Sequence, residues 1–212
     1  MSDTAIIISL ACGLPVIFVV GGLLSIIFSA RGRASRALIT MKTVPISELV
    51  DGARVKVIGK VTAPGADLST SPASGREALC YEVAFRFLSG QTIRGPVRLA
   101  HSASFNVDDG TGSVHVQAGT ARLLLDVDHK SEIPEEGAPE WLFKALRSSG
   151  YQNDPRNPVG RFELEEGIIE VGETVAVVGT VERDASGGRR LVGTEDAELI
   201  VSDDPNLHGA KT

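Results

Sequence analysis

The sequence predicts a mainly β protein in which a single N-terminal transmembrane helix precedes a small antiparallel β-barrel with one short helix. Three observations lead to this fold class: a long N-terminal run without charged residues, short alternating segments bounded by turn residues, and a strand phrase that occurs twice. Alternation at period two indicates half-buried strands, and several such strands at near-regular spacing are typical of small barrels.

The transmembrane helix is predicted for residues 5–30, which contain no charged side chain. As a helix this stretch is roughly 39 Å long, enough to cross a hydrocarbon core of about 30 Å with some tilt. A cleaved signal peptide is the competing interpretation, but it needs a basic segment ahead of a shorter apolar run. Residues 1–4 (MSDT) carry no Lys or Arg, so we expect an uncleaved anchor.

Three arginines, Arg31, Arg33 and Arg36, follow the predicted span in a basic linker at 31–43. Short flanks rich in Lys and Arg stay on the cytoplasmic side of a membrane. We therefore expect residues 1–4 outside and the rest of the chain at the cytoplasmic face. The alternative is that the arginines only solubilise a linker.

The composition excludes several classes of function. Cys12 lies in the predicted span, so the remaining chain has only the Cys80 thiol and cannot form an internal disulfide. The histidines never occur at the spacings of a zinc module. The formal net charge of −6 disfavours binding to a phosphate backbone. We expect no metal, no cofactor and no nucleic-acid partner.

The β-domain is predicted for residues 44–202, followed by a flexible tail at 203–212. The predicted elements are, in order, a strand at 54–63, a Ser/Pro/Gly loop at 66–77, a strand at 78–90, a hairpin at 104–119, a strand at 121–128, a helix at 139–147, a loop at 150–160, a second copy of the first strand at 172–181, and closing strands at 189–193 and 197–202. In the strand at 78–90, Tyr81, Val83, Phe85 and Phe87 share one face.

The repeated phrase is GARVKVIGKV at 52–61 and GETVAVVGTV at 172–181. A glycine within a strand lets it bend sharply or lets another backbone approach closely, as at the corners of small, OB-like barrels. We expect Val57 and Val177 to point into equivalent cores, and Lys56 and Ala176 to lie on an exposed opposite face. Duplication and independent occurrence both remain open. The matched positions are Gly52, Val55, Val57, Gly59 and Val61 in the first copy, and Gly172, Val175, Val177, Gly179 and Val181 in the second.

The order of the motifs resembles the membrane-associated β-domain of the GIDE family, also called the BAM domain. The motifs that carry the resemblance are VKVIGKV, SPASGREALCYEVAF, FNVDDGTGSVHV and ELEEGIIEVGETVAVVGTV, within residues 44–202. In eukaryotes this domain belongs to mitochondrial membrane E3 ubiquitin ligases, which have a second membrane span and a zinc-binding RING. The sequence ends at Thr212 with neither, which predicts a RING-less, bacterial member in the inner membrane.

Two acidic clusters are candidate sites. Asp108 to Gly112 (DDGTG) has oxygen ligands for calcium but lacks the spacing of an EF-hand, so a hairpin turn is the favoured interpretation. Glu163, Glu165 and Glu166 offer paired carboxylates for acid–base chemistry, but a charged run beside a strand favours a solvated face.

Two single residues, His115 and Cys80, are further candidate site residues. His115 lies between Val114 and Val116 and is predicted at the surface. Cys80 would be a nucleophile only with a lowered pKa, and its apolar strand favours an inert core thiol. We therefore predict no catalytic, cofactor-binding or metal-binding residues.

The leading hypothesis is a membrane-anchored, non-catalytic β-domain that binds an unknown protein partner at the cytoplasmic face. One alternative, implied by the resemblance, is a RING-less subunit of an E3 ubiquitin ligase that recognises substrates. Another is an accessory OB-like protein of membrane quality control. The sequence leaves the partner and the oligomeric state open.

Overall fold

The computed structural model describes residues 30–63, 68–89, 92–150, 160–184 and 187–209. These residues form a mainly β protein with two α-helices, of which the sequence predicts only the one at 139–147. The elements are α2 (Ala30–Thr40), η1 (Ile46–Glu48), β1 (Arg54–Thr62), β2 (Ser69–Thr70), β3 (Glu77–Ala78), β4 (Cys80–Ser89), β5 (Thr92–Ser102), β6 (Phe105–Asp108), β7 (Ser113–Val116), η2 (Ala118–Thr120), β8 (Arg122–Leu123), β9 (His129–Pro134), η3 (Glu135–Gly137), α3 (Glu140–Ser148), β10 (Arg161–Ile169), β11 (Thr174–Arg183), β12 (Arg189–Val192), β13 (Ile200–Ser202) and η4 (Pro205–Leu207).

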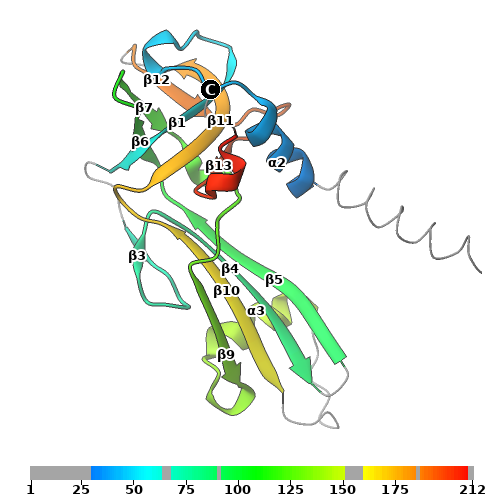
Figure 1. Cartoon of the computed structure of the whole chain (residues 1–212). Coiled ribbons are helices and arrows are strands. Elements are labelled where there is room, and N and C mark those ends of the chain that lie inside the picture. The colour runs from blue at the N-terminus through cyan, green and yellow to red at the C-terminus, as the bar shows by residue number, and fades with distance from the viewer. Residues whose placement is uncertain (1–29, 64–67, 90–91, 151–159, 185–186, 210–212) are drawn as a thin grey trace, which may run out of the picture.

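A closed five-stranded barrel forms one end of the molecule, as the alternating strands predict (Figure 1). Its ring runs β1-β6-β7-β12-β11 and closes where β11 pairs with β1. All of these pairings are antiparallel except that of β7 with β12. β13 and β8 extend the sheet from β11. The barrel encloses a core rich in valine, to which β1, β6, β7, β11 and β12 all contribute.

The two copies of the repeated phrase are paired with each other. Val57 lies opposite Val177 in the β1–β11 ladder, and Val55 and Gly59 lie opposite Gly179 and Val175. Equivalent hydrogen bonds form at the two ends of this ladder: Gly52 N donates to Val181 O at 2.8 Å, and Gly172 N donates to Val61 O at 2.9 Å. The copies are therefore related by a local two-fold arrangement centred on the Val57–Val177 pair, and both valines are completely buried.

The glycines within the two copies meet different neighbours. A Cβ on Gly59 would lie 2.4 Å from the carbonyl oxygen of Asp108, because the end of β6, which pairs with β1 from Lys60 onward, approaches this position closely. A Cβ on Gly179 would lie 2.6 Å from Leu199 Cδ1, the end of a flexible side chain. Both positions need a bare backbone, but only Gly59 faces an atom that cannot move without shifting a strand.

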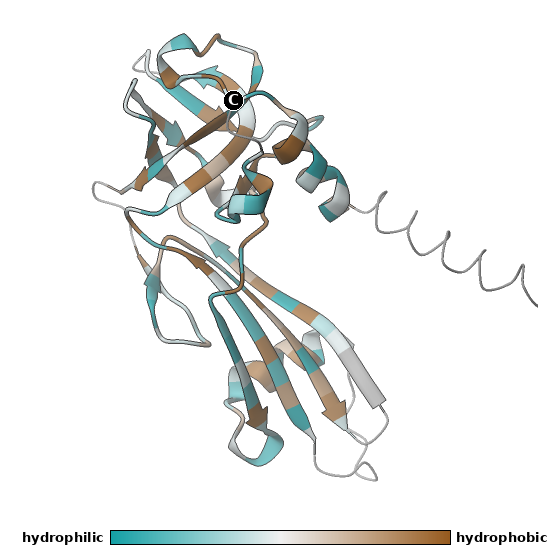
Figure 2. Cartoon of the chain, viewed as in Figure 1, coloured by the Kyte–Doolittle hydropathy of each residue, from teal (hydrophilic) through white to brown (hydrophobic). Residues whose placement is uncertain are grey.

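A second sheet extends away from the barrel, with strand order β5-β4-β10-β9 and α3 packed on one face (Figure 1). Hydrophobic and hydrophilic residues alternate along its strands (Figure 2). Val83, Phe85 and Phe87 share one face of β4, as predicted, and this face packs against α3 in an apolar core with Phe162 and Leu142. The opposite face carries charges of both signs, including the Lys130–Glu165 ion pair.

The sequence analysis did not predict three strands of this second sheet. The sequence of β5 contains Gly95 and Pro96, which are unusual within a strand. β9 has a mostly exposed hydrophilic sequence, and β10 begins with alternating charged residues. Of the predicted strand at 121–128, only Arg122–Leu123 is a strand. The single β-domain predicted from the turn spacing is therefore a barrel joined to a separate sheet.

Helix α2 occupies part of the segment predicted as a basic linker and covers the outside of the barrel. Ala34 and Leu38 are buried against Ala176, Val178 and other apolar side chains of β11 and β13. The expectation that Lys56 and Ala176 are exposed is wrong, since Lys56 is only 2 % exposed and Ala176 is completely buried. The middle of β11 is thus buried on both faces.

The buried ammonium group of Lys56 is hydrogen-bonded to two backbone carbonyl oxygens. Its Nζ donates to Leu38 O at 2.8 Å, in the last turn of α2, and to His208 O at 3.0 Å. Burial lowers the pKa of Lys56. A cation at the C-terminal end of a helix is favourable, so this lysine fastens both α2 and the segment after β13 to the barrel. The predicted tail at 203–212 therefore includes an ordered turn, η4.

The predicted span at 5–30 lies outside the described residues, except for Ala30. Within the described part of the chain, no helix has the length and apolar character needed to span a bilayer.

The two glycines should respond unequally to alanine. We expect Gly59→Ala to lower the free energy of unfolding by about 3 kcal/mol or more and Gly179→Ala by about 1–2 kcal/mol, because overpacking costs more against a rigid backbone. The control is Gly119→Ala, which places a methyl group in open space. Urea unfolding followed by circular dichroism measures all three, and equal losses at positions 59 and 179 would contradict the close approach of β6.

Candidate binding site at the junction of barrel and sheet

A pocket with a volume of about 850 Å³ lies where the barrel meets the second sheet. We call it the junction pocket. Its walls come from β1, β11, the β8–β9 and β10–β11 connections and the segment after β13. The lining residues are Thr43, Ile58, Asp126, Asp128, Glu173, Thr174, Asp203, Pro205, His208 and Gly209.

Four carboxylates line this pocket, and each is held by a backbone N–H group. Asp203 Oδ1 accepts from Asp126 N at 2.7 Å, and Asp126 Oδ1 accepts from Val127 N at 2.8 Å. The other two hold strand ends: Asp128 Oδ2 accepts from Ile168 N at 2.8 Å, and Glu173 Oε2 accepts from Glu170 N at 3.0 Å. Their positions are thus fixed by the loops that they close.

Two of these carboxylates, Asp203 and Glu173, have a raised pKa, and burial is the main cause. Burial raises the pKa of Asp203 to about 7, and the nearby charges of Asp128 and Glu173 add to the shift. Burial also raises the pKa of Glu173, with further contributions from Asp128 and Glu170. No Lys or Arg is among the described lining residues. A partly buried cluster of like charges is unfavourable when empty and favours a cationic group.

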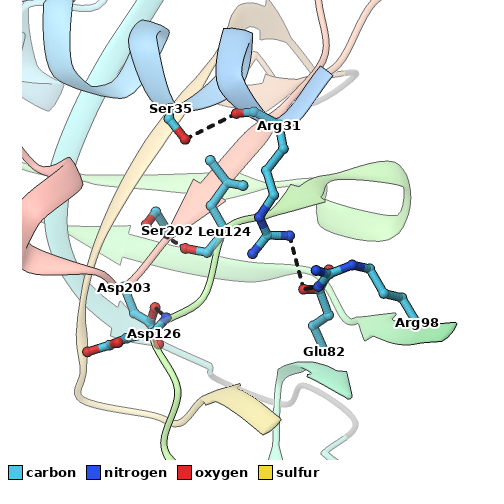
Figure 3. A network of polar contacts seen from close by, with 8 residues as sticks. All are labelled: Arg31, Ser35, Glu82, Arg98, Leu124, Asp126, Ser202 and Asp203. Carbon is cyan, nitrogen blue, oxygen red and sulfur yellow. Dashed lines mark hydrogen bonds and ion pairs between the residues drawn. The ribbon is translucent and has the colours of Figure 1, made fainter. Parts of the chain in front are cut away.

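Polar contacts beside the pocket connect three parts of the molecule (Figure 3). Ser202 Oγ donates to Leu124 O at 2.6 Å, which joins β13 to the segment that leads into the pocket. Arg31 of α2 pairs with Glu82 of β4 at 3.1 Å, and Arg98 of β5 pairs with the same carboxylate oxygen. Arg31, predicted as a membrane-orienting residue, therefore also fastens α2 to the second sheet.

The glutamates considered for acid–base chemistry are separated by the pleat of β10. Glu163 and Glu165 lie on the charged face, where a hydrogen bond from Lys130 lowers the pKa of Glu165. The prediction of a solvated run is wrong for Glu166, which is only 1 % exposed and accepts a hydrogen bond from Ser71 Oγ. This bond attaches the Ser71–Gly75 turn to the second sheet, a structural role for the SPASG motif.

The remaining candidates have structural roles. Both oxygens of Asp109 accept backbone hydrogen bonds, including one from Ile46 N at 2.8 Å. Burial acts to raise the pKa of Asp109, but these bonds outweigh it and the pKa is lowered. The hairpin turn predicted at Asp108–Gly112 is confirmed. His115 is exposed and contacts Asn106.

Cys80 is completely buried in the barrel core. Burial raises the pKa of its thiol to about 12, so it carries no thiolate near neutral pH. Among the described residues, no group of His, Cys, Asp or Glu side chains is arranged to hold a metal ion.

The comparison with protein families agrees with this architecture. The family model named GIDE, described as an E3 ubiquitin ligase, matches residues 97–205, about half of the chain. The chain belongs to the GIDE family. The matched range contains β6–β13 with α3, while β1, β4 and the SPASG motif precede it. None of the curated proteins compared with this chain is significantly similar to it.

The sequence analysis missed all four pocket carboxylates. A signal was present, because Asp126 and Asp128 follow the apolar run LLL, and Asp203 follows LIVS. Acidic residues directly after a buried segment lie where strands leave a core. Their convergence depends on the closure of the barrel, which joins segments far apart in the sequence.

The pH dependence of stability tests the environment of Asp203. Its pKa is raised from 3.8 to about 7 on folding, so its favourable contribution is complete below pH 3.8 and is lost as the pH rises through 7. We expect Asp203→Asn to raise the free energy of unfolding at pH 8 by about 1–2 kcal/mol, after allowance for solvent screening, and to have little effect at pH 4.

The matched control for that measurement is Asp196→Asn, an exposed position on the β12–β13 connection. Urea unfolding of both variants at pH 4 and pH 8 gives the comparison. Equal effects of the two substitutions at pH 8 would show that Asp203 is not in a strained electrostatic environment.

Proposed function

We propose that this GIDE-family chain is a non-catalytic protein-binding domain, held at the cytoplasmic face of a membrane, whose junction pocket receives a Lys or Arg side chain of a partner protein. The observation that carries the proposal is the convergence of four positioned carboxylates in one concave site, with no Lys or Arg among its described lining residues. A partner ammonium or guanidinium group would relieve their mutual repulsion and lower the pKa of Asp203.

The proposal of membrane attachment is supported by the charge-free run at 5–30 and by the way α2 follows it. α2 is fastened at both ends, by Arg31 to Glu82 and by Leu38 O to Lys56. An anchored domain would therefore have a defined orientation to the bilayer. Attachment also raises the effective concentration of the domain for partners in the same membrane. A bacterial inner membrane is the location that we propose.

The family match favours a second candidate function, substrate recognition within an E3 ubiquitin ligase. In that case the domain selects a protein while a catalytic module transfers ubiquitin. Both functions need protein binding at this domain. They differ in whether a captured partner becomes modified, which an assay with the family's ubiquitin-transfer components would reveal.

Site-specific photo-cross-linking tests the junction pocket. A photoreactive amino acid at Thr174, an exposed lining residue, should capture a partner in intact membranes, whereas the same group at exposed Thr194 on the barrel should not. The double substitution Asp128→Asn and Asp203→Asn should reduce the yield at least fivefold, because both side chains keep their hydrogen-bond acceptors and lose their charge.

Asp196→Asn is the matched control for the double substitution and should leave the yield within twofold. Identical products from positions 174 and 194, or a yield unaffected by the pocket substitutions, would reject the junction pocket as the binding site.

Protease accessibility tests the proposed membrane orientation. Protease added to intact cells should leave residues 44–202 uncut, and cleavage should follow permeabilisation, because basic flanks stay on the cytoplasmic side. Replacing Arg33 and Arg36 with Glu, while Arg31 keeps its contact with Glu82, should increase the fraction cut in intact cells. Complete digestion of the unmodified chain in intact cells would reject this orientation.

A further inference from the structure

A second concave surface lies between β5 and α3, at the edge of the second sheet. β5 is an edge strand, since β4 is its only partner strand among the described residues. The groove beside it has a volume of about 480 Å³. We call it the β5–α3 groove, and its lining residues are Val97, Arg98, Leu99, Trp141, Lys144, Ala145, Ser148 and Ser149.

The outer edge of β5 is open over a short, defined length. Pro96 has no N–H to offer and ends the donor row on one side. On the other side Ser102 Oγ donates to Ala118 O at 2.6 Å, where η2 covers the strand. Between these points, no described residue outside β4 forms a backbone hydrogen bond to residues 97–101. About half of the backbone N–H and C=O groups in such an edge strand point away from the sheet and are available to pair with another strand.

The groove floor is apolar. Val97 and Leu99 project from β5 on the face that packs against α3, and both are only half-buried. Trp141 closes the other side and is likewise half-buried, with one ring edge against Phe85 at a centroid distance of 6.1 Å. A partner side chain inserted here would cover three apolar residues that the domain leaves partly in water.

The groove rim is basic, in a chain with a formal net charge of −6. Lys144 is exposed on α3 and forms no ion pair within the described structure. The other cations nearby are already paired: Arg147 contacts Glu140, and Arg98 contacts Glu82. No acidic residue is among the described residues that line the groove. The charge therefore favours an acidic partner, the opposite of the junction pocket.

We propose that the β5–α3 groove binds an extended, acidic segment of a partner protein, which adds to β5 as a fifth strand. Its backbone pairs with residues 97–101, an apolar side chain enters between Leu99 and Trp141, and a carboxylate pairs with Lys144. Side chains two residues apart share one face of a strand, so the apolar and acidic residues are two positions apart in the segment. This inference rests on the proposed function, protein binding, but assigns it a second and separate site.

The test begins with a phage library of linear ten-residue peptides, selected against the full chain in detergent micelles. We expect enriched peptides to carry an apolar residue and an Asp or Glu two positions apart. Lys144→Glu should weaken the binding of an enriched peptide at least tenfold. Lys60→Glu, the same charge change on an exposed barrel lysine, should change it less than twofold.

Backbone methylation of the enriched peptide distinguishes strand addition from simple insertion of a side chain. Methylation of alternate amides, those that face β5, should abolish binding, while methylation of the others should be tolerated. In the same complex, the outward amides of residues 97–101 should exchange hydrogen at least tenfold more slowly. Binding that is insensitive to the position of the methyl group would overturn the proposed strand addition.

Three further results would overturn the inference: no enrichment, enrichment unaffected by Lys144→Glu, or a concentration-dependent dimer that Lys144→Glu abolishes. The last would make a second copy of this chain the occupant. The double substitution Asp128→Asn and Asp203→Asn should leave peptide binding unchanged. Absence of peptide binding at the groove, together with successful cross-linking at Thr174, would reject only this inference. Peptide binding at the groove without cross-linking at Thr174 would reject only the junction pocket.

Discussion

The pairing of β1 with β11 is the constraint on which the rest of the structure depends. It closes the barrel, and it does so between strands that are far apart in the sequence. The second sheet is formed by chain that lies between these two strands, namely β4, β5, β9 and β10, and α3 from the same stretch packs on it. The same closure brings the β8–β9 connection, the β10–β11 turn and the segment after β13 to one place, which is the junction pocket.

The outer face of the same strand pair holds α2, a helix in the segment predicted as a basic linker. β11 buries Val175 and Val177 in the barrel and Ala176 and Val178 beneath α2. A strand buried on both faces is nearly uniformly apolar, which accounts for VAVV. Lys56 is the exception on this surface, and it is accommodated because α2 and the segment after β13 supply backbone oxygens. One strand pair thus links the barrel core, α2 and a wall of the junction pocket.

The sequence predicted the features that local patterns determine. The hairpin at Asp108–Gly112, α3 and the apolar face of β4 follow from turn chemistry and periodicity, and all are present. The face of Lys56 could not be predicted in this way, because alternation identifies two faces but not what covers each of them. Glu166 shows the same limit, since its burial depends on a hydrogen bond from Ser71, 95 residues away.

The junction pocket and the β5–α3 groove could not be predicted from the sequence for a related reason. Asp126, Glu173 and Asp203 belong to three separate connections, and only the closed barrel places them in one pocket. The β5–α3 groove depends on β5, whose Gly95-Pro96 pair made it an unlikely strand on propensity alone. On an edge strand the missing N–H of a proline is tolerated. Gly95 and Pro96, which disfavoured a strand in the sequence, are thus consistent with the position of β5 at the edge of the sheet.

Two strands make the barrel and the second sheet continuous. β4 begins with Cys80 in the barrel core and continues to Phe85 and Phe87 in the second core, while β10 runs from Phe162 in the second core to Ile169 in the barrel. β4 and β10 are paired in register from Cys80–Ile169 to Leu88–Arg161, so one continuous ladder connects the two cores. The junction pocket and the β5–α3 groove have opposite charge. If both proposed sites bind, a partner that offers a basic side chain to the pocket and an acidic strand to the groove would gain affinity from both, whereas a partner with the charges exchanged would be repelled at both.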